Sequence, residues 1–166
     1  MVPTAEAADG GGRARFLADA AARGLDVEVV QRLAAHSLEE AAGILGITPA
    51  DIVKSLVVKH KDGSFLFALI PGDRQISWPK LRSLVGVNKL SLPPAEVAFD
   101  ATGYERGTIT PLGSTKAWPV YADHTITGRR ISMGAGQHGY SAFVDADALT
   151  AALGATVADI SDPNPM

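Results

Sequence analysis

Two apolar, β-rich runs that lie close together in the chain constrain its fold more than any other feature. Ser55 to His60 and Phe65 to Ile70 are separated by Lys61-Asp62-Gly63. An Asp-Gly pair between such runs is a strong β-hairpin signal, because glycine reaches the positive φ values that tight turns require. Pro71-Gly72-Asp73 then breaks the second run. The sequence therefore predicts an antiparallel strand pair in this part of the chain.

Helices and strands mix along the rest of the chain without βαβ regularity, which predicts one α+β domain with a mixed sheet. Helices are expected at 13–23, 37–46, 77–84, 94–99 and 145–153. Further strands are expected at 26–30, 118–122, 129–133, 140–144 and 156–160. Residues 100–117 are expected to form a long ordered loop. Small and polar residues, with three consecutive glycines, predict a disordered tail over 1–12, followed by the domain at 13–162.

Composition and charge exclude several classes of protein. The chain has no cysteine, which excludes disulfides, a thiolate nucleophile and cysteine-ligated zinc. It has no apolar run long enough for a membrane span and no signal-peptide pattern at its start, so we expect a cytoplasmic protein without membrane contact. The net charge is −3, yet residues 74–130 hold eight basic and four acidic residues. That segment fits either a few phosphate contacts or a solvated surface.

The segment from Gly103 to Gly113 is the most informative for chemistry. It holds three glycines and a proline in eleven residues, within a loop too long to be a simple turn. Such a loop can point several backbone N–H groups at one spot, which suits a carbonyl oxygen or a developing oxyanion. A purely structural crossover loop explains the same composition.

Two other features have both a functional and an ordinary interpretation. Gly134 to Gly139 could line the same cleft or form a wide hairpin between strands. Lys54, just before an apolar strand, is either a surface residue with a buried stem or a functional ammonium. The histidines, at positions 36, 60, 124 and 138, have no metal-binding spacing, so neither a metal nor another cofactor is expected.

Motifs spread from Leu25 to Ile160 occur in a specific order. They are Glu40-Ala41-Ala42, Leu45-Gly46, Val53-Lys54-Ser55-Leu56, Ile70 to Arg74, Thr102-Gly103-Tyr104, Gly107, Thr110-Pro111-Leu112-Gly113, Gly136 to Gly139, and Gly154-Ala155 with Ala158-Asp159-Ile160. In this order and spacing they resemble the YbaK/EbsC family, relatives of the editing domain inserted in bacterial prolyl-tRNA synthetases.

The resemblance implies a trans-acting deacylase that hydrolyses the ester between a wrong, small amino acid and the 3′ end of a tRNA. The resemblance is compatible with small amino acids such as Cys, Ala or Ser, and the tRNA for proline is one candidate. It implies a largely antiparallel, barrel-like sheet packed with helices, and no side-chain nucleophile. Lys54 and Gly107 would be catalytic. Substrate would bind Gly103, Tyr104, Thr108, Thr110, Pro111, Gly136, His138 and Gly139.

Two departures from the family pattern bear on specificity. The Cys-tRNA(Pro) deacylase branch carries a tyrosine near the positions equivalent to Gln31–Leu33, and none stands there. The second glycine turn contains Gln137-His138 where the family often has Lys or Arg. The alternative to an enzyme is a module of the same fold that binds the tRNA end or a synthetase without turnover. The amino acid, the tRNA and the oligomeric state do not follow from the sequence.

Overall fold

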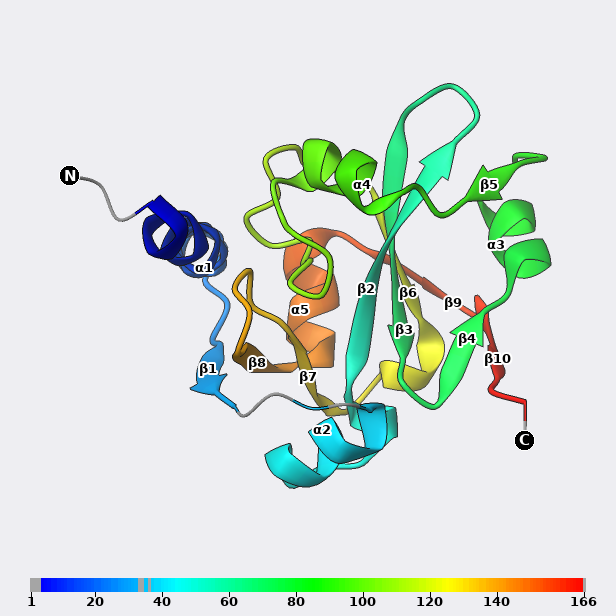
Figure 1. Cartoon of the computed structure of the whole chain (residues 1–166). Coiled ribbons are helices and arrows are strands. Elements are labelled where there is room, and N and C mark those ends of the chain that lie inside the picture. The colour runs from blue at the N-terminus through cyan, green and yellow to red at the C-terminus, as the bar shows by residue number, and fades with distance from the viewer. Residues whose placement is uncertain (1–3, 33–34, 36, 166) are drawn as a thin grey trace.

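The computed structural model describes residues 4–32, 35 and 37–165 (Figure 1). Its α-helices are α1 (Thr4–Ala22), α2 (Leu38–Leu45), α3 (Trp78–Val85), α4 (Ala95–Thr102) and α5 (Ala146–Leu153), with 3-10 turns η1 (Pro49–Asp51) and η2 (His124–Ile126). Its strands are β1 (Glu28–Gln31), β2 (Val53–His60), β3 (Phe65–Pro71), β4 (Arg74–Ile76), β5 (Leu90–Ser91), β6 (Val120–Asp123), β7 (Arg130–Gly134), β8 (Tyr140–Asp145), β9 (Thr156–Ala158) and β10 (Ser161–Pro163).

The predicted hairpin is confirmed and forms the middle of the largest sheet, whose strand order is β5-β2-β3-β6-β9. β2 and β3 pair antiparallel, with Lys54 opposite Ile70. β6 and β9 extend the sheet in parallel. β1, β8 and β7 make a second, antiparallel sheet, and β10 pairs with β4. The expected α+β fold with a mixed, largely antiparallel sheet is therefore confirmed.

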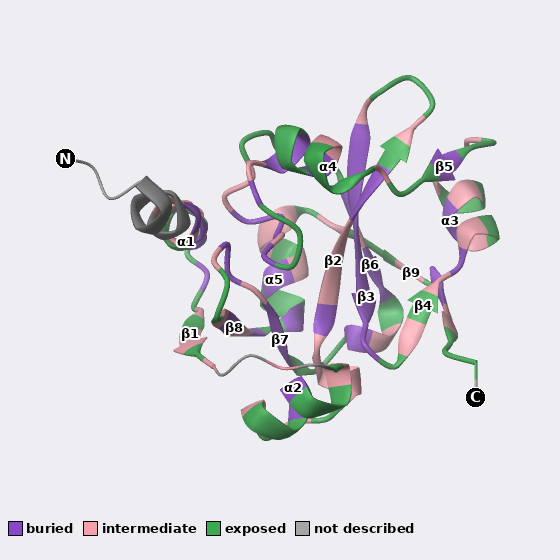
Figure 2. Ribbon diagram, viewed as in Figure 1, coloured by how far each residue is buried: buried purple, intermediate pink, exposed green. Residues whose placement is uncertain are grey.

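The sheets do not close into a barrel, which corrects the barrel-like expectation. β5 and β9 end the five-stranded sheet, and β1 and β7 end the other. Among the described residues, a single parallel bridge between Ile52 and Ser132 joins the two sheets. The core lies on both faces of β3, whose seven residues are all buried (Figure 2). Its odd-numbered side chains enter one hydrophobic cluster, shared with α1, α5 and the second sheet, and its even-numbered ones enter another, beneath α3.

The N-terminal helix is longer than the sequence predicts. α1 begins at Thr4, so residues 4–12 of the expected disordered tail are helical, whereas residues 1–3 lie outside the described residues. Glycines weaken a helix, but tertiary packing overrides propensity here. Gly12 is buried against the β7–β8 turn, where a side chain on Gly136 would come within 2.6 Å of the Gly12 carbonyl oxygen. β4, β5 and β10 are further elements that the sequence did not predict.

Other helix boundaries agree more closely with the ranges expected from the sequence. The Ser37 side chain accepts a hydrogen bond from the Glu40 N–H, and Asp145 accepts one from the Ala148 N–H. α4 runs to Thr102, several residues past its predicted end, and Gly103 then stops it with φ of 78°. The predicted loop therefore begins at Gly103.

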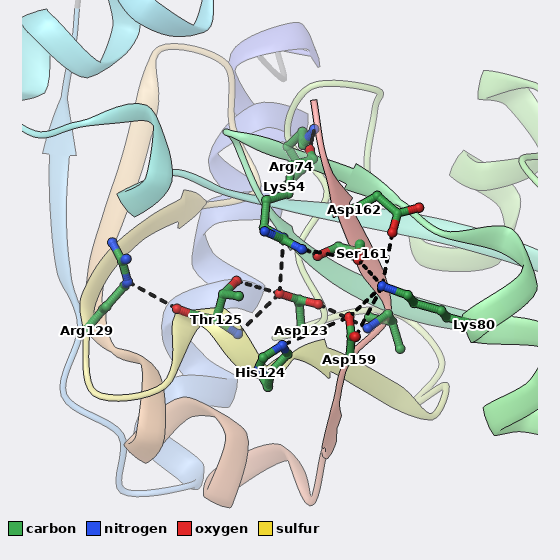
Figure 3. Close-up of polar contacts among 11 residues, drawn as sticks. Lys54, Arg74, Lys80, Asp123, His124, Thr125, Arg129, Asp159, Ser161 and Asp162 are labelled. Carbon is green, nitrogen blue, oxygen red and sulfur yellow. Dashed lines mark hydrogen bonds and ion pairs between the residues drawn. The ribbon is translucent and has the colours of Figure 1, made fainter. Parts of the chain in front are cut away.

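A buried carboxylate connects the C-terminal segment to the sheet (Figure 3). Asp123, at the end of β6, is fully buried and accepts hydrogen bonds from the Thr125 hydroxyl and N–H and from the Ile160 N–H at 3.1 Å. Arg74 Nε lies 4.0 Å away and donates to Ser161 Oγ. Burial would raise the pKa of Asp123, but the hydrogen bonds from Thr125, Ile160 and Ser161 outweigh it and hold the pKa below its ordinary 3.8.

We expect Asp123→Asn to lower the free energy of unfolding at pH 7 by about 1–3 kcal/mol, because an amide N–H₂ would face backbone donors. The folded-state pKa of Asp123 is depressed, so its contribution is present above pH 3.8 and is lost as pH falls through the lower, folded-state value. Urea unfolding at pH 7 and at acidic pH measures both effects. The control is Asp162→Asn at an exposed ion pair with Lys80, which should change stability by less than about 1 kcal/mol. Equal losses of unfolding free energy in Asp123→Asn and Asp162→Asn would contradict the stabilising role given to the buried Asp123 carboxylate.

Candidate functional site

The free edge of β2 provides one wall of the candidate site. A hydrogen bond of 2.7 Å from the Gly72 N–H to the Ile52 carbonyl shows that Ile52 bonds toward β3. Because bonding direction alternates along an antiparallel strand, Val53, Ser55 and Val57 point their backbone groups away from β3. β5 covers only the far end of β2, and the bridge from Ile52 to Ser132 of β7 lies at the near end. Between these two contacts, no other strand among the described residues pairs with this edge of β2.

A cavity of about 440 Å³ lies along this edge. Residues from β2, α2, α4, β7, β8 and the 103–113 loop line it, together with Arg32. Its charged lining residues, among those the structure describes, are Arg32, Lys54 and Arg106, and no carboxylate joins them. Arg32 Nε donates to Ser141 Oγ at 2.8 Å on β8. A cavity with several cations and no described carboxylate favours an anionic ligand or a ligand that develops negative charge.

Lys54 lines this cavity, but its ammonium has a partner of its own. Because side chains alternate along β2, Lys54 points to the face opposite Val53 and Val57. Its Nζ donates to the carbonyl oxygen of Arg74 at 3.0 Å (Figure 3). Burial lowers the pKa of Lys54 from its ordinary 10.5, and the nearby Asp73 carboxylate partly opposes this effect. Lys54 is thus a partly buried cation rather than a mobile surface lysine.

Gly107 reaches the same cavity from the 103–113 loop. Its φ of 92° is a left-handed conformation that favours glycine. The loop packs closely on β7, since a side chain on Gly134 would come within 2.7 Å of the Ile109 carbonyl oxygen. The Gly136 N–H also donates to the Thr108 carbonyl at 3.1 Å. The two glycine-rich segments therefore pack together, with Gly107 and Gly134 at the cavity.

Most of the other predicted substrate-binding residues build the loop and do not line the cavity. Tyr104 is buried and its hydroxyl donates to the Leu112 carbonyl at 2.7 Å. Burial, the main cause, raises the pKa of Tyr104 to about 12. Thr108 Oγ1 donates to the Glu105 carbonyl at 2.8 Å, and Thr110 Oγ1 accepts from the Leu112 N–H at 3.2 Å. Pro111 is buried as well, and Gly103 ends α4.

The second glycine turn lies beside the cavity rather than in it. His138 lines a separate shallow hollow, and its Nε2 lies 3.6 Å from a carboxylate oxygen of Glu105. A side chain on Gly107 would lie 3.6 Å from the imidazole, so His138 lies close to that glycine. Gly136 packs on α1, and Gly139 has open space around it. Their direct contact with substrate stays a prediction.

Sequence reasoning missed several cavity residues, of which Ser55 is the clearest. Its hydroxyl is buried and has no hydrogen-bond partner among the described residues, although it lines the cavity. A buried hydroxyl without a partner is costly, which makes Ser55 a candidate ligand contact. Ser55 lies between Val53 and Val57 on the strand face that the structure shows to be directed into the core. Tyr140 also lines the cavity, from a position opposite Gln31, while Leu33 lies outside the described residues.

A metal role receives no support from the described residues. Asp123, His124 and Asp159 bring ligand atoms within 4.8 Å of one another. The Asp123 carboxylate already accepts hydrogen bonds, and Asp159 forms an ion pair of 3.1 Å with Lys80. His36 lies outside the described residues. Within the described part of the chain, no helix has the length and apolar character to cross a bilayer.

Comparison with known proteins relates the chain to proline–tRNA ligases. The chain is 30% identical over 101 residues to the proline–tRNA ligase of Bacillus licheniformis, covering 61% of this chain and 18% of that protein. It is 36% identical over 91 residues to that of Thermosipho africanus, covering 55% and 16%. The chain thus spans less than a fifth of these relatives.

A solved structure is similar over nearly its whole length. It is named as a candidate trans-editing enzyme for prolyl tRNA synthetase, and the match has a TM-score of 0.83 and 27% identity, covering 91% of this chain and 97% of that one. Residues 33–152 match the family described as the aminoacyl-tRNA editing domain, and the chain therefore belongs to that family.

Proposed function

We propose that the protein is a trans-acting deacylase that hydrolyses the ester of a mischarged aminoacyl-tRNA. The observation that carries the proposal is the cavity at the edge of β2, where Gly107 lies beside a lining whose described charges are all cationic. The family and the structural neighbour support an editing role. We propose the cytoplasm as its location, the aminoacyl-tRNA 3′ end as its partner, and a synthetase as a second partner.

The chemistry requires little from protein side chains. The water oxygen bonds to the ester carbonyl carbon, and the bond from that carbon to the ribose oxygen breaks. The ribose oxygen takes a proton that the attacking water loses. Backbone N–H groups of the 103–113 loop near Gly107 would polarise the carbonyl and stabilise the oxyanion. The described lining holds three serines but no histidine or carboxylate that could activate one of them. Water is therefore the nucleophile we propose.

The three cations fit the remaining part of the substrate. The terminal nucleotides carry phosphates, and we expect them to contact Arg32, Lys54 and Arg106, which line the cavity. In this structure Lys54 Nζ binds the Arg74 carbonyl, and we expect the ammonium to exchange this partner for the substrate. The same bond is the observation that favours the alternative, a binding module without turnover, because a lysine held on Arg74 throughout would serve only the β4 turn.

We expect Lys54→Ala to lower the deacylation rate by about 10²–10³, the usual loss when one charged or hydrogen-bonding group is removed from a hydrolytic site. Lys54→Arg should recover little if position matters, because the guanidinium is larger and planar. Initial rates on Cys-tRNA(Pro) and Ala-tRNA(Pro) measure the effect, with circular dichroism as the folding control. Lys59→Ala, an exposed lysine on the same strand, is the matched control and should deacylate normally. A folded Lys54→Ala protein with wild-type rates would favour the binding module.

We expect tRNAs charged with Ala, Ser or Cys to be cleaved faster than those charged with Ile or Phe. Buried Val53, Val57, Ala98 and Met133 line the cavity, and we propose that they restrict the size of the side chain it accepts. Size discrimination is worth about 1–3 kcal/mol per methylene, so the difference should reach tenfold or more. A panel of these five amino acids on one tRNA, compared by kcat/KM, makes the test. Equal cleavage of the Phe and Ala esters would refute selection by size.

A further inference from the structure

Helix α1 contacts both ends of the loop that carries Gly107. Arg15 Nη2 donates to the Gly103 carbonyl at 2.8 Å, and Arg15 Nε donates to the Gly113 carbonyl at 3.2 Å. One planar guanidinium therefore fixes two carbonyls that are ten residues apart in the chain. A bond at each end restricts how far the intervening residues can move.

Asp19, one helical turn further along α1, completes the contact. Its Oδ2 accepts a hydrogen bond of 2.8 Å from the Gly113 N–H, so both backbone groups of Gly113 bind α1. Residues four apart lie on one face of a helix. The Arg15 guanidinium also lies 4.8 Å from the centre of the Tyr104 ring, whose hydroxyl holds the Leu112 carbonyl.

The fit between α1 and the loop is tight. A side chain on Gly113 would come within 2.6 Å of the Arg15 carbonyl oxygen, and one on Gly103 within 2.8 Å of Arg15 Nη2. These two glycines thus allow the helix to approach, which is a different role from contact with substrate. Neither Arg15 nor Asp19 lines the cavity.

The part of the chain that matches the editing family begins at residue 33. The loop around Gly107 lies within that match, but the helix that holds it, Thr4–Ala22, lies before it. The contacts that hold both ends of the loop thus come from a helix outside the matched segment.

We propose that Arg15 and Asp19 are positioning residues for deacylation, which hold the 103–113 loop so that its backbone at Gly107 meets the ester in the cavity. This inference rests on the proposed function. Because neither side chain lines the cavity, the loss of either should disturb the geometry of the reacting groups more than the binding of tRNA. A displacement of about 1 Å at a reacting group can cost as much as 10² in rate.

The test combines kinetics with hydrogen exchange in the full chain. The substrate is whichever of Ala-tRNA(Pro) and Cys-tRNA(Pro) the wild type cleaves faster. On that substrate Arg15→Ala should lower kcat about 10- to 100-fold and change KM less than about twofold. Arg15→Lys, which can bond one carbonyl at a time, should recover part of kcat. Hydrogen exchange should accelerate in the 103–113 segment. Asp19→Ala should act in the same direction, and it tests the proposal through a second residue if Arg15→Ala does not fold.

The control is Arg129→Ala, which removes an arginine that likewise binds a carbonyl, that of Thr125, and a carboxylate, that of Asp51. It should leave kcat and loop exchange unchanged. Wild-type kcat in folded Arg15→Ala and Asp19→Ala proteins would overturn the proposal, whether or not loop exchange accelerates. A wild type inactive on both tRNAs would instead overturn the proposed function, and loop exchange would still decide whether α1 holds the loop.

Discussion

The burial of β3 on both faces is the constraint on which the rest of the structure depends. Its alternate side chains supply two separate hydrophobic clusters, so helices and strands must cover both sides of the sheet. β3 has β2 on one side and β6 on the other, which leaves β2 toward the margin of the sheet. The candidate site follows from this order, because the cavity lies along the margin where β2 has no strand partner over part of its length.

Local signals explain why much of the fold was predictable. Asp62-Gly63 marks the hairpin, and Ser37, Ser77 and Asp145 each cap a helix where the sequence predicts one. Contacts between distant segments explain why other parts of the fold could not be predicted. α1 reaches back to Thr4 against the glycine propensity, and β4 forms through pairing with β10, with Arg74 opposite Pro163. No window of the sequence contains both partners of such a contact.

The site shows the same division. Motif spacing drew attention to Lys54 and Gly107, and both line the cavity. Composition could not tell which residues of the 103–113 loop face a ligand and which support the loop, because glycine serves both purposes. Gly103 and Gly113 lie against Arg15, and Tyr104 and Thr110 bond within the loop. Ser55 was overlooked because a serine in a strand has no distinctive sequence signal until its neighbours are known to face inward.

The free edge of β2 also has a consequence for the solution behaviour of the protein. An unpaired strand edge is a template on which another chain can add a strand, and proteins protect such edges with charge, proline or covering segments. Here Pro93, Pro94, Arg32 and Arg106 line the cavity along this edge. We expect the groups that suit the cavity to an anionic substrate also to hinder strand addition by a second copy of the chain, so that one set of side chains would serve both recognition and resistance to aggregation.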